Sequence, residues 1–226
     1  RKYGFRRAFT LRPHLLKGML SISGWTMVQS FISVSIWFIF FLAIEHLGER
    51  PLAVTNIVRN ISALLIMVIS AFATTAGALI SNQIGAGEQR CLFKTCGMTL
   101  KLTYAILIPL LIILCLFPES VLRAFTDSPS LIAASVNSVY VMASSTLIMA
   151  PSFILFNAVS GTGNTRAGFI MEMISLAVYT AVIYYGIIRL KPDVALCWFS
   201  EHVYGVTLIF LAWWYLKSGK WRGKKV

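Results

Sequence analysis

A long stretch without charge is the feature that most constrains the fold of this chain. The 28 residues from 60 to 87, between Arg59 and Glu88, carry no charged side chain. An α-helix rises about 1.5 Å per residue, so about 20 apolar residues already cross a hydrocarbon core about 30 Å thick. The sequence therefore predicts a membrane-spanning helix over about 52–83. The Gly-Ala-Gly run at 85–87 predicts its end.

Polar and small side chains recur every three or four residues along this predicted helix. They are Asn56, Asn60, Ala63, Met67, Ser70, Thr74 and Ala78. Hydrocarbon offers no hydrogen bonds, so this polar stripe is expected to face other helices or a watery cavity, while Leu64 and Ile66 on the opposite face meet lipid. We expect Asn56, Arg59 and Asn60 to face a polar edge on the fourth predicted span.

Composition places the whole chain in the same class. Of the 226 residues, 58% are hydrophobic and 12% are charged, and the mean hydropathy of +0.77 is that of an integral membrane protein. The predicted spans are about 18–44, 52–83, 91–117, 131–159, 166–188 and 194–216. The predicted fold class is thus an all-α integral membrane protein, a bundle of six transmembrane helices. A basic lead at 1–17 precedes the bundle and a basic tail at 217–226 follows it.

The distribution of positive charge predicts the topology. Six crossings bring both ends to one side of the membrane, and fifteen of the 20 lysines and arginines fall on that side. Because cytoplasmic segments carry the excess of Lys and Arg, both ends are expected to be cytoplasmic. The net charge of +12 is concentrated at these ends, where anionic headgroups lie, so nucleic-acid binding is not expected.

Few residues could carry chemistry of other kinds. The four cysteines lie in or beside apolar segments with no Cys-x-x-Cys pair, so neither a metal site nor a disulfide is predicted. Glu201 beside His202 is too small a group for a catalytic site, and no catalytic residue is predicted. A transporter lobe, a membrane-embedded enzyme and a structural subunit remain as function classes, and the polar stripe favours the transporter.

Two predicted spans end in a similar motif, Gly-x-Gly-x-x-Arg. It reads GAGEQR at 85–90 and GTGNTR at 161–166. No strand precedes either motif, so neither is a dinucleotide fingerprint, and a helix C-cap followed by a turn is the preferred interpretation over ligand contact. The repetition indicates two hairpins of similar design.

These motifs also carry a resemblance to a known family. The stretch ALISNQIGAGEQR resembles the end of the eighth helix of multidrug and toxic compound extrusion (MATE) transporters, and ILFNAVSGTGNTR resembles the turn after the tenth helix. The loop FPESVLRAFTDSPSL and the terminal YLKSGKWR fit the same carboxyl-terminal half. The family's turn glycines and arginine correspond to Gly85, Gly87, Gly161, Gly163 and Arg166.

The resemblance implies the second six-helix lobe of a secondary active, proton- or sodium-coupled antiporter that exports small amphipathic or cationic substrates. It further implies a first six-helix lobe as partner, no other cofactor and a bacterial inner membrane location. A flippase for lipid-linked sugars, from the same superfamily, is the alternative. The chain begins at Arg1, which favours a piece of a longer protein. The acids that the family's cation-binding branches carry in the first and fourth helices of this lobe are missing, so coupling is expected to use other residues or the first lobe.

The candidates for the substrate or ion pathway are polar residues within predicted spans. They are Gln29, Asn56, Arg59, Asn60, Asn137, Glu172 and Tyr179. Polar residues inside a membrane are costly and mark pathways, although interhelical hydrogen bonding is a competing role. Arg59 is expected to pair with Glu45, Glu201 or a backbone carbonyl. Glu172, about one and a half turns into its span, is either a functional acid or a hydrated interfacial one.

Overall fold

The computed structural model describes the backbone of residues 13–219 and 221, and their side chains apart from those of 13–23, 25 and 26. Most of the basic lead, together with tail positions 220 and 222–226, lies outside the described residues. The elements are α1 (Pro13–Glu45), α2 (Glu49–Gly85), η2 (Gln89–Cys91), α3 (Leu92–Leu116), α4 (Pro118–Leu122), α5 (Pro129–Gly161), α6 (Thr165–Val182), the π-helix η3 (Ile183–Arg189), α7 (Val194–Cys197) and α8 (Ser200–Ser218).

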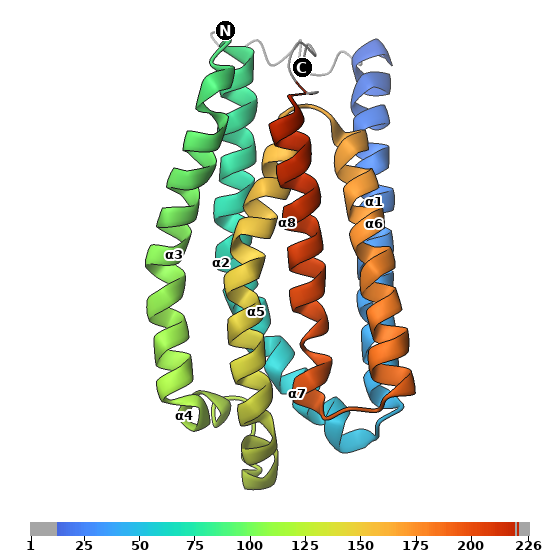
Figure 1. The fold of residues 1–226 in the computed structure, drawn as a ribbon, viewed down its shortest axis with the longest axis vertical. Helices are drawn as coiled ribbons and strands as arrows, with labels where there is room; N and C mark the ends of the chain where they lie inside the picture. Colours follow the sequence, from blue (N-terminus) through green and yellow to red (C-terminus); the bar gives the residue numbers. More distant parts are fainter. Residues whose placement is uncertain (1–12, 220, 222–226) are drawn as a thin grey trace, which may run out of the picture.

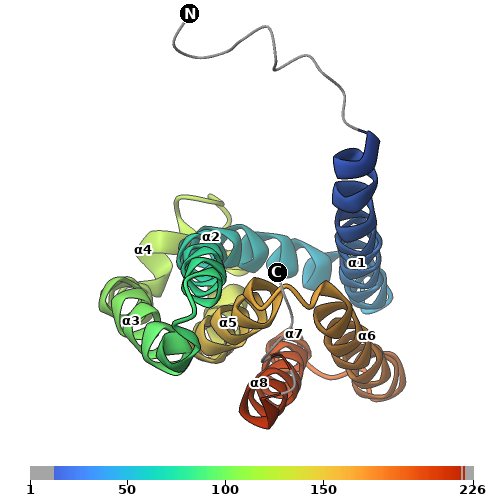
Figure 2. The same ribbon diagram turned by 90° about the horizontal axis from the view of Figure 1, so that it is seen from above.

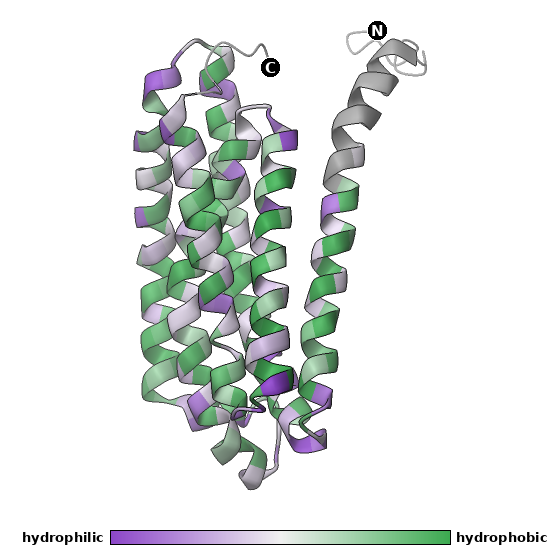
Figure 3. Ribbon diagram, turned by 45° about the vertical axis from the view of Figure 1, so that its right-hand side comes forward, coloured by the Kyte–Doolittle hydropathy of each residue, from purple (hydrophilic) through white to green (hydrophobic). Residues whose placement is uncertain are grey.

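The predicted all-α bundle is confirmed. Among the described residues, six helices are long and apolar enough to cross a membrane, with η3 extending α6 and α7 leading into α8. The helix α1 begins and α8 ends at the same end of the bundle (Figure 1). Hydrophobic positions dominate the middle of the helices, and hydrophilic positions are concentrated toward their ends (Figure 3).

The helix α5 lies at the centre of the bundle. Viewed from above, it stands between α2 and α3 on one side and α6 and α8 on the other, and α1 stands at the edge (Figure 2). In its hydrophobic stretch 56% of the residues are buried, against 17% to 39% in the other spans. Small side chains such as Ser135, Ala150 and Ala158, all fully buried, let neighbouring helices approach α5 closely.

The helices α2 and α5 approach each other closely near the end where both finish. A Cβ atom at Gly161 would lie 2.5 Å from the carbonyl oxygen of Gly77, and one at Gly77 would lie 2.9 Å from that of Asn157. Both distances are shorter than side chains tolerate, so glycine is required at these two positions.

Both Gly-x-Gly motifs form helix ends, as the capping interpretation predicted. Gly87 and Gly163 have positive φ angles of 82° and 77°, which glycine adopts without strain. In the second motif, the side chain of Asn164 then accepts a hydrogen bond from the amide of Ala167 at 3.3 Å and caps the start of α6.

A proline inside the fourth span, Pro151, does not break the helix. The helix α5 continues through Pro151, which has no N–H to donate to the carbonyl of Leu147. The hydroxyl of Tyr104 on α3 donates to that carbonyl instead, at 2.7 Å. A neighbouring helix thus satisfies the oxygen that proline leaves free, which keeps α5 intact in a membrane setting.

Candidate functional site

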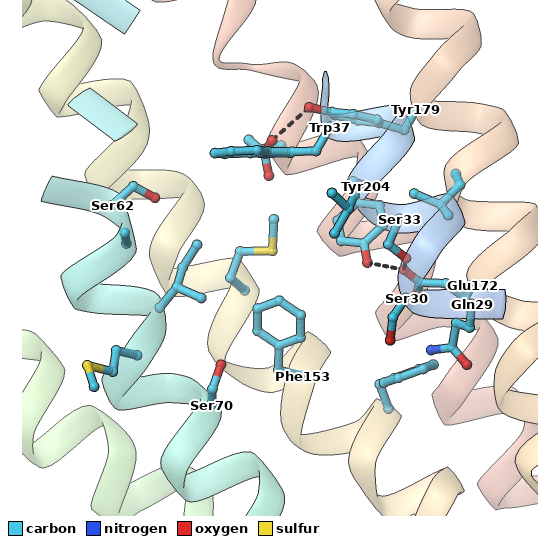
Figure 4. Close-up of a pocket in the computed structure, with 18 of the residues that line it drawn as sticks. Gln29, Ser30, Ser33, Trp37, Ser62, Ser70, Phe153, Glu172, Tyr179 and Tyr204 are labelled. Carbon is cyan, nitrogen blue, oxygen red and sulfur yellow. Dashed lines mark hydrogen bonds between the residues drawn. The ribbon is translucent and has the colours of Figure 1, made fainter. Parts of the chain in front are cut away.

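A cavity of about 690 Å³ opens between α1, α2, α5, α6 and α8. Most of its wall is apolar or aromatic, as in sites that bind small organic molecules. The apolar lining includes Val34, Trp37, Met67, Met149, Phe153 and Phe156. In Figure 4, Ser33, Glu172, Tyr179 and Tyr204 gather where α1, α6 and α8 meet, and Ser62 and Ser70 lie across the cavity on α2.

Glu172 on α6 is the most buried charged residue of the cavity, with 4% of its surface exposed. One oxygen, Oε1, accepts hydrogen bonds from Ser33 Oγ on α1 at 2.9 Å and from Tyr204 Oη on α8 at 3.0 Å (Figure 4). The carboxyl therefore ties three helices together at one point.

Glu201 is a second carboxyl in the same cavity, at the first turn of α8. Its Oε1 accepts a hydrogen bond from Tyr179 Oη on α6 at 2.8 Å. The Tyr179 ring packs edge to face against Tyr204, with the ring centroids 5.8 Å apart. Glu201 and Glu172 are thus connected through two tyrosines in contact.

Neither carboxyl has a cationic partner in the part of the chain that the structure describes. Their side-chain partners are hydroxyl groups. Burying an uncompensated charge in a membrane is expensive, so such an acid either carries a proton or binds a cation from the cavity. The cluster can therefore exchange protons or cations with the cavity.

Arg59 on α2 lines the cavity as well. Its guanidinium carbon lies 5.8 Å from the ring centroid of Trp37 and 5.3 Å from that of Phe41, both on α1. The expected ion pair with Glu45 or Glu201 is absent from the described structure, because aromatic faces on α1 occupy that place instead.

Of the seven candidates, Gln29, Arg59, Glu172 and Tyr179 line the cavity, and their role in transport stays a prediction. The cavity lining does not include Asn56, Asn60 or Asn137.

The expectation that Asn56 and Asn60 face a polar edge of the fourth span, which carries Asn137, is therefore corrected. Asn56 donates to its own helix, at the carbonyl of Leu52, and Asn60 and Asn137 are exposed. Ser144, on the same edge as Asn137, bonds His202 of α8 at 2.9 Å. Ile66, expected to face lipid, lines the cavity.

Sequence reasoning missed Glu201, Tyr204 and Ser33. Glu201 follows a loop in the sequence, near the start of the sixth predicted span, so it does not stand out as an acid within the membrane. A signal was present, because Glu201 and Tyr204 are three residues apart and so share a helix face. On the preceding span, Glu172, Ser175 and Tyr179 share a helix face in the same way, at positions i, i+3 and i+7.

Comparison with known families supports the fold. The family model described as MatE matches residues 26–185. None of the curated proteins matches the chain.

Several solved transporters share the architecture. A Vibrio cholerae MATE transporter, VcmN in its bent form, is 15% identical with a TM-score of 0.82 over 92% of this chain and 48% of its own. An outward-facing multidrug resistance MATE family transporter is 14% identical, with a TM-score of 0.79 over 90% and 46%. A MOP superfamily transporter from Pyrococcus furiosus is 14% identical, with a TM-score of 0.77 over 88% and 44%. The chain thus spans about half the length of these transporters.

Proposed function

Because the chain belongs to the MATE (MatE) family of membrane transporters, we propose that it forms the second six-helix lobe of a cation-coupled efflux antiporter for small amphipathic or cationic molecules. The coupling ion is a proton or sodium, and the membrane is a bacterial inner membrane. A first six-helix lobe supplies the opposite wall of the pathway. The half-length match to solved transporters supports this partner.

The observation that carries the proposal is the pair of carboxyls, Glu172 and Glu201, in one largely apolar cavity. An apolar wall suits an amphipathic substrate, and an acid that lacks a fixed cation can hold either the coupling ion or a cationic substrate. If the coupling ion and the substrate compete for Glu172 and Glu201, the inward flux of the ion is coupled to the outward flux of the substrate.

The test is transport by the full-length protein that carries this lobe, reconstituted in proteoliposomes. An imposed proton or sodium gradient is expected to drive uptake of a fluorescent organic cation. Glu172→Gln and Glu201→Gln should each abolish the response to the gradient. The control is Glu119→Gln, an exposed acid on α4 that should leave the flux unchanged. Flux that ignores both gradients, or equal behaviour of all three variants, would contradict the proposal.

A flippase for lipid-linked sugars is the second candidate. It is favoured by one observation, the cationic Arg59 at the cavity wall, because such lipids carry their sugar on phosphate. Translocation of a lipid-linked sugar across vesicles, without flux of organic cations, would assign this function instead.

A further inference from the structure

We propose that Arg59, which lies over the rings of Trp37 and Phe41, is an oxyanion-binding subsite of the cavity. The substrate class it implies is an amphipathic molecule with a carboxylate, phosphate or sulfonate attached to an apolar body. This inference rests on the proposed transport function and adds a substrate group that the two carboxyls cannot bind.

The guanidinium of Arg59 lies some way in from the ends of the two helices that hold it. Arg59 lies ten residues after α2 begins at Glu49, a rise of about 15 Å. Its guanidinium lies against rings of α1 that are four and eight residues before that helix ends at Glu45, a depth of about 6–12 Å. A side chain that reached for the surface would not lie over Trp37, the deeper of these rings.

The bonding of the guanidinium leaves its donors available. Aromatic faces compensate charge but accept none of the five N–H bonds in the way an oxygen does. No hydrogen bond or ion pair of Arg59 is found among the side chains that the structure describes, and both cavity carboxyls are already bonded to hydroxyls elsewhere. The planar fork of an arginine matches an oxyanion with two parallel hydrogen bonds.

The surroundings specify the rest of the ligand. The cavity wall also includes Trp37, Ile66 and Met67, and Met67 is 72% exposed. An apolar body placed on this wall would cover exposed hydrophobic surface while its oxyanion meets the guanidinium. The same wall would hold an uncharged analogue less tightly, because it lacks the group that the guanidinium binds.

Binding to the full-length protein that carries this lobe, in nanodiscs without any gradient, tests the proposal. The two probes are naphthoate and naphthamide, which share the ring system and differ in the charge of one group. Calorimetry is expected to show naphthoate binding that Arg59→Gln weakens about tenfold or more, with naphthamide binding unchanged. Arg59→Lys should bind naphthoate with an affinity between those of the parent and Arg59→Gln. Lysine keeps the positive charge but lacks the planar guanidinium that makes two parallel hydrogen bonds.

The control is Arg50→Gln, which removes a positive charge at the same end of α2. Arg50 is exposed and contacts the carbonyl oxygen of Ser130 at 3.3 Å, outside the cavity. It should bind naphthoate as the parent does. If Arg59→Gln lowers thermal stability, the naphthoate affinities of Arg59→Lys and Arg50→Gln are compared instead. Weaker binding by Arg59→Lys than by Arg50→Gln supports the subsite, and equal binding contradicts it.

The lipid composition distinguishes two sources of the oxyanion, a lipid headgroup and a free substrate. Nanodiscs of phosphatidylcholine alone are compared with nanodiscs that contain phosphatidylglycerol. Loss of naphthoate binding in the anionic lipid, with naphthamide binding unchanged, would assign the subsite to a lipid headgroup, whereas unchanged naphthoate binding assigns it to a free substrate. Equal affinities for naphthoate and naphthamide, or no effect of either Arg59 variant, would overturn the subsite. Because no gradient is used, this outcome is distinct from failure of gradient-driven transport.

Discussion

Tyr179 is the side chain that joins the two acids of the cavity. Its hydroxyl bonds Glu201 at 2.8 Å, and its ring contacts Tyr204, which bonds Glu172. The tyrosine itself is 3% exposed. A group with this position affects both carboxyls when it is changed.

Tyr179→Phe is expected to lower the free energy of unfolding by about 1–3 kcal/mol, because it leaves the Glu201 carboxyl without its hydroxyl donor. Equilibrium unfolding in detergent measures the change. The matched control is Tyr184→Phe, since the Tyr184 hydroxyl accepts only a 3.4 Å contact from Arg189 and the residue is 44% exposed. Equal losses in the two variants would show that the buried hydrogen bond is not responsible.

Glu172 could be predicted from the sequence as a site residue, whereas Glu201 could not. Glu172 stands alone in a charge-free stretch, so its cost in a membrane marks it directly. Glu201 follows a loop, and only the turn at α7 brings it against Tyr179, 22 residues earlier in the chain. Arg59 was located in the membrane by sequence, but its aromatic partners were not, because they depend on how α1 packs.

At the scale of elements, α5 shows how a helix keeps its continuity at a proline. The carbonyl of Leu147 accepts from Tyr104 on α3 because Pro151 cannot donate to it. The sequence showed the proline but not the donor, which lies 43 residues away.

A double-mutant cycle tests this compensation. Tyr104→Phe alone should destabilise the protein, whereas in a Pro151→Ala background it should cost less, because residue 151 then supplies the N–H. A coupling of about 1 kcal/mol is expected from unfolding equilibria. Tyr140→Phe on α5, whose hydroxyl contacts the Cys115 carbonyl at 3.5 Å, should show no coupling to Pro151. Additive effects of Tyr104→Phe and Pro151→Ala would refute the link.

The contact of α2 with α5 makes a second prediction at this scale. Gly161→Ala would place a methyl group 2.5 Å from the Gly77 carbonyl, so the helices must separate and the melting temperature should fall by several degrees. Gly97→Ala is the control, since nothing lies within 4 Å of a Cβ there and alanine favours the helix. Thermal unfolding in detergent reports both. A Gly161→Ala protein as stable as the parent would mean that the backbones are not in contact.

At the scale of the whole molecule, the remaining question is orientation. The helices alternate in direction, so the turn after α2 and the end of α8 share one side and the loop before α5 lies on the other (Figure 1). The excess of Lys and Arg predicts that the first of these sides is cytoplasmic.

Cysteine labelling measures this orientation in cells. In a background without the four native cysteines, Ser81→Cys and Gly219→Cys should react only from the cytoplasm and Ser128→Cys only from outside. An impermeant maleimide distinguishes the two sides. Labelling of Gly219→Cys and Ser128→Cys from the same side would rule out six crossings in this arrangement.

The number and class of helices could be predicted because charges are excluded from hydrocarbon, so each gap between charges marks a span. The cavity could not be predicted as a whole, because its lining comes from five helices that the chain order does not pair. Gln29 and Tyr179, for example, reach the same cavity from α1 and α6.

The backbone contact between Gly77 and Gly161 also has a mechanical consequence. With no side chain between them, the two helices have nothing there that can change rotamer, so a tilt of one helix against the other would pivot at this point. Arg59 lies eighteen residues from Gly77 along α2, a lever arm of about 27 Å. A tilt of about 5° at the glycines would therefore carry the guanidinium about 2 Å, which is enough to break a hydrogen bond. A small rotation at one end of the bundle would thus change the contacts that the Arg59 guanidinium makes near the other end.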